Sequence, residues 1–439
     1  MTRVSDGLGV SRAEEPSTQS TLASIFDLLL EGYQNGDFLI RVGDRVLKKP
    51  SDRAARYALV FRAPETVRRM FMSPSERSFG EAYIDADFDI EGDLNAVFPL
   101  VDYVRNRPLS IAQNLRMIRL LLSLPRPRAV RSTRRALGLL GAPHSKERDR
   151  KAVTYHYDLP AAFYSLWLDP QMVYSCAYFE SEGSTLAEAQ ERKLDRICRK
   201  LRLEKGQRFL DIGCGWGGLL IFACRNYGAK ALGVTLSQAQ ADFARAAIER
   251  AGLKDRCEVR VADYRDLDEW GQFDRLASVG MFEHVGAKKL EEYFHRAYRL
   301  LRPGGLFLNH GVAFCSGEPA ARASFGEGKN SFFGTCVFPD GELVPLSVTI
   351  QAAERSGFEV RDVEGMREHY ALTLRQFQSR LNACRDEALE LVSEATFRIW
   401  KLYLAAAIHE FVSARLTIYQ VVLAKTDNGA VGLPLVRAL

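Results

Sequence analysis

The sequence places a carboxylate beside an imidazole at the end of an apolar run. In "SVGMFEHVG", residues 278–286, Glu283 and His284 end the stretch that begins "DRLASVGMF". Burying such groups is costly, so they indicate either a solvated strand end or a working site with a proton acceptor. Adjacent residues that leave a strand tend to point apart, so the two side chains do not form a dyad. On this stretch alone, the solvated strand end is favoured.

A glycine-rich turn occurs earlier in the chain. It reads "LDIGCGWGG" and contains Asp211, Gly213, Gly215 and Gly217. Glycines between a strand and a helix let the backbone approach a ligand, and they leave helix N-terminal amides pointing at it. A dinucleotide site would have GxGxxG and an acid closing the second strand, whereas this chain has GxGxGG and Thr235. Asp211 can accept a hydrogen bond from an α-amino group, so the turn, the "VADYRD" loop and "LLRPGG" together indicate binding of S-adenosylmethionine (SAM).

Alternating strands and helices must position these residues. Apolar runs such as "QRFLDIG", "KALGVT" and "FDRLASVG" alternate with helical stretches such as "SQAQADFARAAIERAG". This βαβ series predicts a mostly parallel sheet, and "FEVRDVEG" and "RLTIYQVVLA" suit an antiparallel pair that closes one edge. We therefore expect an α/β catalytic domain over residues 151–425, followed by a C-terminal tail over 426–439.

The N-terminal part of the chain has a different pattern. Residues 1–20 predict a disordered tail, and residues 21–105, with stretches such as "DFLIRV", predict a small α+β domain. Residues 106–150 predict a basic amphipathic linker, since thirteen Lys or Arg face two acids between Arg105 and Lys151. Its run "IAQNLRMIRLLLSL" suits an anionic membrane surface, a solvated helix packed on the catalytic domain, or nucleic acid; all three interpretations stay open.

Composition limits the class of protein. With 47% hydrophobic residues, 26% charged residues and a net charge of +5, the 439-residue chain is typical of a globular protein of two or three domains. The eight cysteines include no CxxC pair and no zinc-type spacing, so we expect reduced thiols and no metal site. No window has the length of a transmembrane helix and the N-terminus lacks an apolar signal-peptide core, so we expect a cytoplasmic location.

Five separated motifs carry a family resemblance. They are "HYDLPAAFYSLWLDPQMVYSCAYF", "DIGCGWGG", "GVTLS", "VGMFEHVG" and "LRPGG". In this order they resemble the cyclopropane-fatty-acyl-phospholipid synthases and the related mycolic acid cyclopropane synthases, over about residues 150–425. "SFGEAYIDADFDIEGDL" resembles the smaller N-terminal domain of the same family. The resemblance implies a Rossmann-like SAM-dependent methyltransferase fold with a seven-stranded sheet. It also implies methylation of the cis double bond of phospholipid acyl chains, with closure of a cyclopropane ring.

The implied reaction passes through a carbocation, and in the family a bound bicarbonate is taken to remove the proton. The motifs place the catalytic set on Cys176, Glu283, His310, Val312 and Tyr370. His310 and Tyr370 would donate to the anion, and Val312 would offer its backbone amide. Glu283 would accept a proton or hold His310, which makes His310 its expected partner. The family commonly has Ile where Val312 stands, and no metal is implied.

The resemblance also assigns the cofactor contacts. They comprise a segment before the first strand, the glycine turn, the ribose side and the adenine side: Tyr174 and Ser175; Asp211, Gly213, Gly215 and Gly217; Thr235, Leu236 and Gln240; Asp263, Arg265 and Asp266. Four aromatic residues, Tyr178, Phe179, Tyr403 and Tyr419, suit either an acyl channel or ordinary core.

The implied substrate gives the basic segment a purpose. An enzyme that works on phospholipid in a bilayer must dock on it, so we expect peripheral association with anionic lipid at the inner face of the membrane. No nucleic-acid partner is expected, since the chain lacks the Pro-Pro-aromatic and Pro-Cys methylase motifs. A homodimer stays open. Two other activities also stay open: a same-fold enzyme that leaves a methyl or methylene branch, and a non-catalytic lipid-binding protein with a SAM fold.

Overall fold

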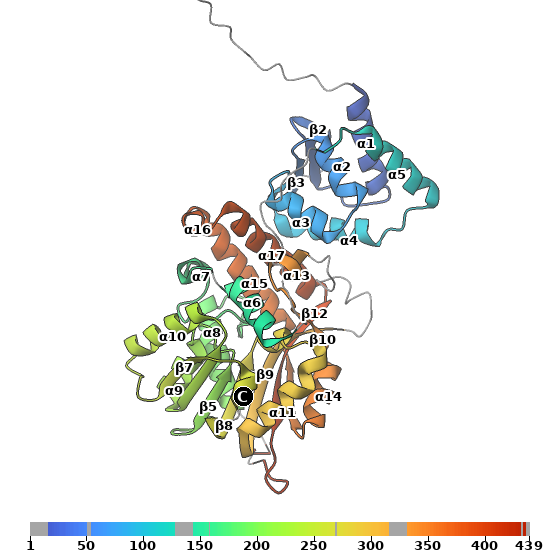
Figure 1. Cartoon of the computed structure of the whole chain (residues 1–439). Helices are drawn as coiled ribbons and strands as arrows, with labels where there is room; N and C mark the ends of the chain where they lie inside the picture. The colour runs from blue at the N-terminus through green and yellow to red at the C-terminus, as the bar shows by residue number, and fades with distance from the viewer. Residues whose placement is uncertain are drawn as a thin grey trace, which may run out of the picture. The chain divides into compact units, whose positions relative to one another are not determined.

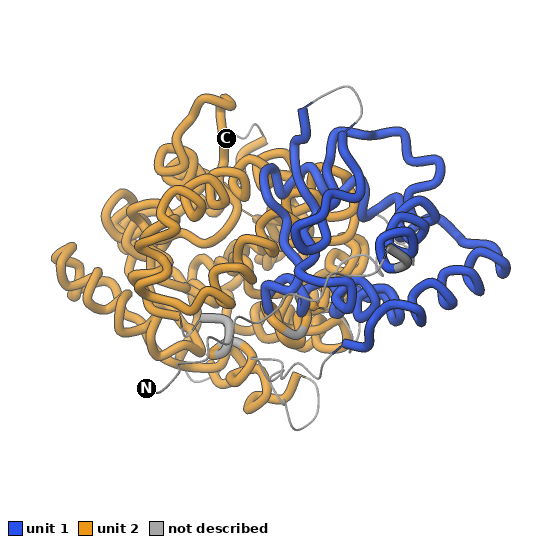
Figure 2. Tube along the Cα trace, turned by 90° about the horizontal axis from the view of Figure 1, so that it is seen from above, with its two compact units in different colours: residues 1–133 blue, residues 134–439 orange. Residues whose placement is uncertain are grey.

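The chain forms two compact units, residues 1–133 and 134–439 (Figure 2). The computed structural model describes residues 16–50, 54–127, 144–157, 159–267, 270–315, 332–431 and 433–435. The boundary between the two units falls inside the segment predicted as a linker, residues 106–150. The first half of the expected linker is a helix of the first unit, and its last residues begin a helix of the second unit. The basic residues between 128 and 143 lie outside the described residues.

The first unit has a four-stranded sheet in the order β2-β1-β3-β4. β1 and β3 are parallel, and the two outer pairs are antiparallel. Residues on β1 and β3 alternate between buried and partly buried positions, as expected for strands with one face on a core. The unit comprises α1 (Pro16–Leu30), β1 (Phe38–Val42), β2 (Arg45–Lys48), β3 (Tyr57–Phe61), α2 (Pro64–Met72), α3 (Glu76–Ile84), β4 (Phe88–Gly92), α4 (Phe98–Asn106) and α5 (Ile111–Ser123).

Two helices of this unit depart from the predicted boundaries. α1 begins at Pro16, inside the segment predicted as a tail, because Leu22 and Ile25 are buried in the core. α5 begins with a capping box at Ser110 and packs against α1 and α2, burying Met117 and Leu121. The amphipathic segment is therefore an integral helix of the first unit.

The second unit has a large sheet in the order β11-β12-β9-β8-β5-β6-β7, with a short β10 beside β9. Strands β5 to β9 are parallel, while β12 is antiparallel to both β9 and β11. The predicted parallel sheet with a closing antiparallel pair is confirmed. Its strands are β5 (Arg208–Ile212), β6 (Lys230–Thr235), β7 (Cys257–Val261), β8 (Phe273–Val279), β9 (Leu301–Phe314), β10 (Val344–Pro345), β11 (Glu359–Gly365) and β12 (Leu416–Ala424).

Helices cover both faces of this sheet (Figure 1). α8, α9 and α10 bury one face, and α11 and α14 bury the other. Figure 1 shows α6, α7 and α15 to α17 beyond the carboxyl ends of the parallel strands. The helices are α6 (Lys146–Tyr157), α7 (Ala161–Trp167), α8 (Leu186–Lys200), α9 (Gly218–Tyr227), α10 (Gln238–Arg250), α11 (Leu290–Leu300), α13 (Phe332–Cys336), α14 (Leu346–Arg355), α15 (Arg367–Ala383), α16 (Arg385–Leu391) and α17 (Glu394–Val412).

The chain order reverses at β5, which has β6 on one side and β8 on the other. In open α/β sheets, a crevice for ligands forms at such a switch point, outside the carboxyl ends of the strands. The candidate site lies at this end of β5.

Candidate functional site

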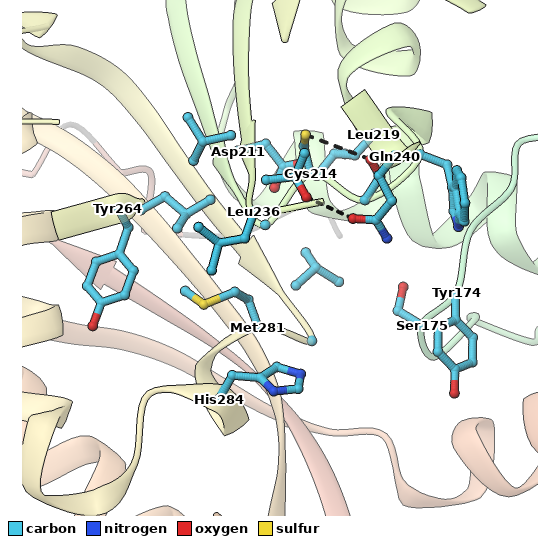
Figure 3. A pocket seen from close by; sticks show the side chains of 18 of the residues that line it. Tyr174, Ser175, Asp211, Cys214, Leu219, Leu236, Gln240, Tyr264, Met281 and His284 are labelled. Atoms are coloured by element: carbon cyan, nitrogen blue, oxygen red, sulfur yellow. Dashed lines mark hydrogen bonds between the residues drawn. The ribbon is translucent and has the colours of Figure 1, made fainter. Parts of the chain in front are cut away.

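A cavity at the end of β5 collects most of the predicted cofactor contacts (Figure 3). Its lining includes Tyr174, Ser175, Asp211, Gly213, Gly215, Thr235, Leu236, Gln240, Asp263 and Arg265. Gly217 and Asp266, the other two predicted contacts, are not among the lining residues. In Figure 3, Tyr174 and Ser175 stand on one side of the cavity, and Met281 and His284 stand on another.

The glycine turn connects β5 to α9 in left-handed conformations. Gly213, Gly215 and Gly217 have φ of +84°, +52° and +88°. A Cβ at Gly213 would come within 2.7 Å of Met281 Cγ, so this position also needs the missing side chain for space. Gly217 is the N-cap of α9 and lies against Ala244, which gives it a packing role rather than a lining role.

Asp211 supplies the buried charge of the cavity. Its side chain is fully buried, and Oδ1 has no hydrogen-bond partner among the described residues. Burial raises the pKa of Asp211 to about 7, although the nearby Lys193 lowers it. An orphaned buried carboxylate oxygen is a site for a cationic donor, so the residue fits the α-ammonium group of SAM.

Another part of the cavity wall is formed by side chains at and after the end of β6. Thr235 Oγ1 donates to Gln240 Oε1 at 2.8 Å, shown as a dashed line in Figure 3. Ser237 caps α10, because its Oγ accepts a hydrogen bond from the backbone amide of Gln240 at 3.2 Å. The carboxamide of Gln240 is thus fixed at the cavity wall, where it can bond ribose hydroxyls in place of the acid found in dinucleotide sites.

The third group of predicted contacts is joined by ion pairs. Arg265 binds Asp263 at 2.6 Å and Asp149 at 2.9 Å, and all three residues line the cavity. Asp266 instead pairs with Lys146 and is half exposed, so its predicted role in binding the cofactor is not supported. Asp149 was missed because the surrounding sequence is basic and α6 could not be placed beside this loop from its sequence.

Glu283 lies in a short 3-10 turn, Phe282–His284, just after β8. Glu283 is partly buried, Oε1 accepts from the Val312 backbone amide at 2.8 Å, and Oε2 is buried with no partner among the residues described. Burial raises the pKa of Glu283 to about 7, so both protonation states are accessible near neutral pH. The neighbouring His284 lines the cavity, and burial lowers its pKa to about 4.

His310 lies on β9 and is fully buried. Gln420 Nε2 is 3.2 Å from His310 Nδ1, so Nδ1 accepts and Nε2 carries the proton. Nε2 has no partner in the described part of the chain, and burial holds the pKa of His310 well below its usual value. Two expectations are therefore corrected, because Glu283 bonds the Val312 amide rather than His310. That amide is already occupied and is not free for an anion.

Cys176 belongs to the segment between α7 and α8 and lies against Met366, the residue before α15. Tyr370 lies in the first turn of α15. The Cys176 thiol is 3.3 Å from the Ala177 carbonyl oxygen and 3.8 Å from that of Met366, and burial raises its pKa, so it stays a neutral donor. Tyr370 lies one helical turn after Met366, with its ring edge-on to Phe411 at 4.7 Å. Cys176, Glu283, His310, Val312 and Tyr370 do not line the cavity, although Cys176 directly follows the lining residue Ser175 and His310 pairs with the lining residue Val279.

An aromatic wall stands beside Tyr174, and of its other rings only Tyr403 was among the aromatic residues that the sequence suggested for an acyl channel. The Tyr174 ring lies 5.5 Å from Trp167, 5.8 Å from Trp400 and 6.0 Å from Phe377. Tyr403 extends the wall, with its ring 5.9 Å from Trp400. Burial raises the pKa of Tyr403 to about 12, and the charge of Glu283 contributes to this shift. Aromatic residues on helices look like ordinary core in a sequence, so only the fold shows that they gather here.

The other aromatic candidates take structural positions. Tyr178 is stacked on His369 at 4.5 Å, and the guanidinium of Arg196 lies over the same ring at 4.4 Å. Phe179 is buried and its amide donates to His369 Nδ1. These contacts tie the segment after Cys176 to α8 and α15. Tyr419 lies on β12 opposite Gly311 and Gly365.

Comparison with known proteins identifies the family. Residues 144–421, well over half of the chain, match the family model described as mycolic acid cyclopropane synthetase. The chain belongs to this family. A "probable fatty acid methyltransferase" of Pseudomonas putida is 39% identical over 354 residues, which cover 80% of this chain and 83% of that protein. The cyclopropane-fatty-acyl-phospholipid synthase of Escherichia coli K12 is 36% identical over 65% of this chain and 71% of its own length.

Solved structures of the synthetase family have the same fold as the second unit. Mycolic acid cyclopropane synthase CmaA1, complexed with SAH and CTAB, matches with 32% identity and a TM-score of 0.58 over 62% of this chain and 97% of its own. The protein is therefore an enzyme of the SAM-dependent methyltransferase type, and its glycine-turn cavity is the candidate SAM site.

Proposed function

We propose that the protein transfers a one-carbon unit from SAM to the cis double bond of unsaturated acyl chains in membrane phospholipids and closes a cyclopropane ring. The observation that carries this proposal is the juxtaposition of three features. The lining of the SAM cavity includes Tyr174, whose ring belongs to an aromatic cluster with Trp400. His310 and Glu283, which have buried atoms without partners in the described residues, lie beside or just after the end of β8, which also lines the cavity. Family membership and the names of the relatives support lipid acyl chains as the substrate class.

The aromatic wall suits a reaction that develops positive charge on a hydrocarbon. SAM, when bound, presents a methyl group on a sulfonium centre, which is the electrophile that an alkene needs. The alkene carbon that bonds this methyl group leaves its neighbour cationic. Faces of Tyr174, Trp400 and Tyr403 can stabilise such a cation in a desolvated site.

The ring closes when the new methyl group loses a proton and its carbon bonds the cationic carbon. A small bound anion can be the base that takes this proton. His310 Nε2 can donate a hydrogen bond to the anion, and Glu283 Oε2 can accept one from its hydroxyl group; both atoms are buried and lack a partner among the described residues. We propose that they hold bicarbonate, with the phenol of Tyr370 as a further donor. The Val312 amide takes part only through Glu283, which it anchors at 2.8 Å.

A second product is favoured by one comparison. The Pseudomonas putida relative, which covers 80% of this chain, is described as a probable fatty acid methyltransferase. A 1,2-hydride shift would move the positive charge of the same cation to the carbon that carries the new methyl group, and loss of a proton from that methyl group would then leave a methylene branch. The ring and the branch have the same mass, since each adds one carbon and two hydrogens, but only the branched product keeps an alkene.

The deciding experiment uses the full-length protein, SAM carrying a labelled methyl group, and vesicles of dioleoyl phosphatidylglycerol. We expect labelled lipid whose acyl chains have gained one CH2 unit, which is fourteen mass units plus the mass added by the label, and have lost the olefinic proton signals. Vesicles of saturated lipid should gain no label. Olefinic signals that remain in the labelled lipid would assign the methylene branch. Absence of label from lipid, with SAM binding demonstrated in the same preparation, would contradict the proposal.

The exposed side of α5 supports membrane docking. Ile111, Leu115, Ile118 and Leu122 recur at helical spacing and have exposed fractions of 81%, 54%, 45% and 52%. Arg116 and Arg119 are also exposed on this helix. An apolar stripe flanked by arginines suits the interface of an anionic bilayer, and we propose that α5 lies there. No helix among the described residues is long and apolar enough to cross a membrane.

Substitution within the stripe tests this docking. We expect Leu115→Asn together with Ile118→Asn to reduce co-sedimentation with anionic vesicles at least about tenfold, because polar amides forfeit the free energy of apolar burial. Val412, an equally exposed residue at the end of α17, supplies the matched control Val412→Asn, which should bind like wild type. Equal binding of wild type to neutral and anionic vesicles, at low and high salt, would exclude the electrostatic part of the proposal.

A further inference from the structure

A buried lysine of α8 has fewer partners than its charge requires. The Lys193 side chain is fully buried and lines the SAM cavity. Its ammonium group donates to Ser175 Oγ at 2.9 Å, and it forms no ion pair with any carboxylate in the described ranges. An ammonium group has three donors, and leaving buried donors without acceptors is costly. An anion in the cavity would satisfy them.

The carboxylates nearest to Lys193 do not fill this role. Asp169 accepts hydrogen bonds from the backbone amides of Gln171 and Val173, both at 2.9 Å, and forms no ion pair with Lys193 in the described part of the chain. Asp211 lines the same cavity and interacts with Lys193 through charge, but the two form no ion pair in the described part of the chain. The cavity lining thus includes one buried cation and one buried anion, each with capacity to bind a ligand.

The hydroxyl partner of Lys193 is fixed by the same helix. Gln190, one turn earlier on α8, donates to the carbonyl oxygens of Val173 at 3.2 Å and Ser175 at 2.8 Å. This holds the segment 173–175 against the cavity, so Ser175 Oγ and the Lys193 ammonium form one rigid pair of polar groups. Lys200, the other buried lysine of α8, instead pairs with Asp362 and Glu364 and does not line the cavity.

We infer that Lys193, with Ser175, binds the α-carboxylate of SAM, while Asp211 binds its α-ammonium group. The two buried charges of the cavity thereby match the two charges of an amino acid. Burial lowers the pKa of Lys193 to about 8, and a bound carboxylate would oppose that shift. The inference rests on SAM binding in this cavity and not on the identity of the acyl product.

Isothermal calorimetry with two ligands tests the inference directly. The ligands are S-adenosylhomocysteine and its decarboxylated amine analogue, which lacks only the carboxylate. We expect the wild type to bind S-adenosylhomocysteine about ten- to a hundredfold more tightly than the analogue, as for a hydrogen-bonded charge pair. Lys193→Met should lose this preference because its affinity for S-adenosylhomocysteine falls, while its affinity for the analogue stays within about threefold of that of wild type.

Two further variants distinguish carboxylate binding from a structural role. Lys200→Met removes a buried lysine from the same helix and should keep the wild-type preference between the ligands. Ser175→Ala should lower the affinity for S-adenosylhomocysteine several-fold and should lower the affinity for the analogue less. Without ligand, Lys193→Met should melt no lower than wild type, because methionine removes an incompletely paired buried charge. Retention of the full ligand preference by Lys193→Met would overturn the inference. Failure of wild type to bind either ligand would instead contradict the assignment of the cavity to SAM.

Discussion

Glu283 is the residue whose protonation depends most directly on the fold. Its Oε2 atom is buried, and the Val312 backbone amide donates to Oε1. Backbone hydrogen bonds lower the pKa of Glu283, but they do not compensate for desolvation of the charge, which is why the pKa rises from 4.5 to about 7. A carboxyl group tuned to this range can exchange a proton with a neighbouring base near neutral pH.

This shift predicts how stability changes with pH. Because the folded pKa is raised, the contribution of Glu283 to stability is complete below about pH 4.5 and is lost as pH rises through about 7. The glutamine of Glu283→Gln does not titrate, so the variant has no such loss of stability at high pH. The stability of the variant relative to wild type should therefore increase by about 3 kcal/mol between pH 4.5 and 8.

Urea unfolding followed by tryptophan fluorescence measures this difference. All four tryptophans lie in the second unit, so their signal reports the unit that contains Glu283. Asp211 has a pKa shifted in the same direction, but it is present in both proteins and cancels. A stability difference that stays constant over this pH range would show that folding does not shift the pKa of Glu283.

At the scale of elements, the turn that carries Glu283 is seated on a glycine of β9. A Cβ at Gly311 would come within 1.9 Å of Phe282 Cε1, so Phe282 packs directly over the backbone there. We expect Gly311→Ala to displace the turn and to reduce transfer to lipid at least about tenfold. S-adenosylhomocysteine affinity should hold, because Gly311 does not line the cavity.

Gly365 offers the matched control, since it is a strand glycine whose added Cβ would make an ordinary 3.4 Å contact with Tyr419. Gly365→Ala should keep activity within about threefold of wild type. Activity assays and calorimetry on both variants separate damage to the catalytic turn from damage to the fold. Wild-type turnover by Gly311→Ala would show that the turn can move without loss of function.

The elements also show which features could be predicted from the sequence. The glycine turn and Asp211 were found because their chemistry is local, and the sheet was found because its alternation of strands and helices is regular. The partner of His310 could not be found, since Gln420 lies 110 residues later on a strand whose register is set by packing. Lys193 could not be found either, because in the sequence it is one of several charged residues on an amphipathic helix, and only the fold shows that it is buried.

At the scale of the whole molecule, the SAM site belongs to the second unit alone. Every residue that lines the cavity lies at or after Asp149. The match to the CmaA1 synthase covers 97% of that chain but 62% of this one, so a unit of this size forms an entire protein elsewhere in the family. The first unit is an addition, and its exposed α5 stripe suggests that it brings the enzyme to the bilayer.

Separation of the two units therefore has a specific expected outcome. Residues 134–439 expressed alone should bind S-adenosylhomocysteine within about threefold of the full-length protein, because the cavity is complete. They should lose binding to anionic vesicles and transfer poorly to lipid in bilayers. Transfer to the same unsaturated lipid dispersed in detergent should persist, since that substrate needs no membrane docking. Circular dichroism and calorimetry would first verify that the isolated unit folds. If it then modified vesicle lipid as fast as the full-length protein, bilayer docking would have to be a property of the catalytic unit, and the stripe on α5 would need another partner.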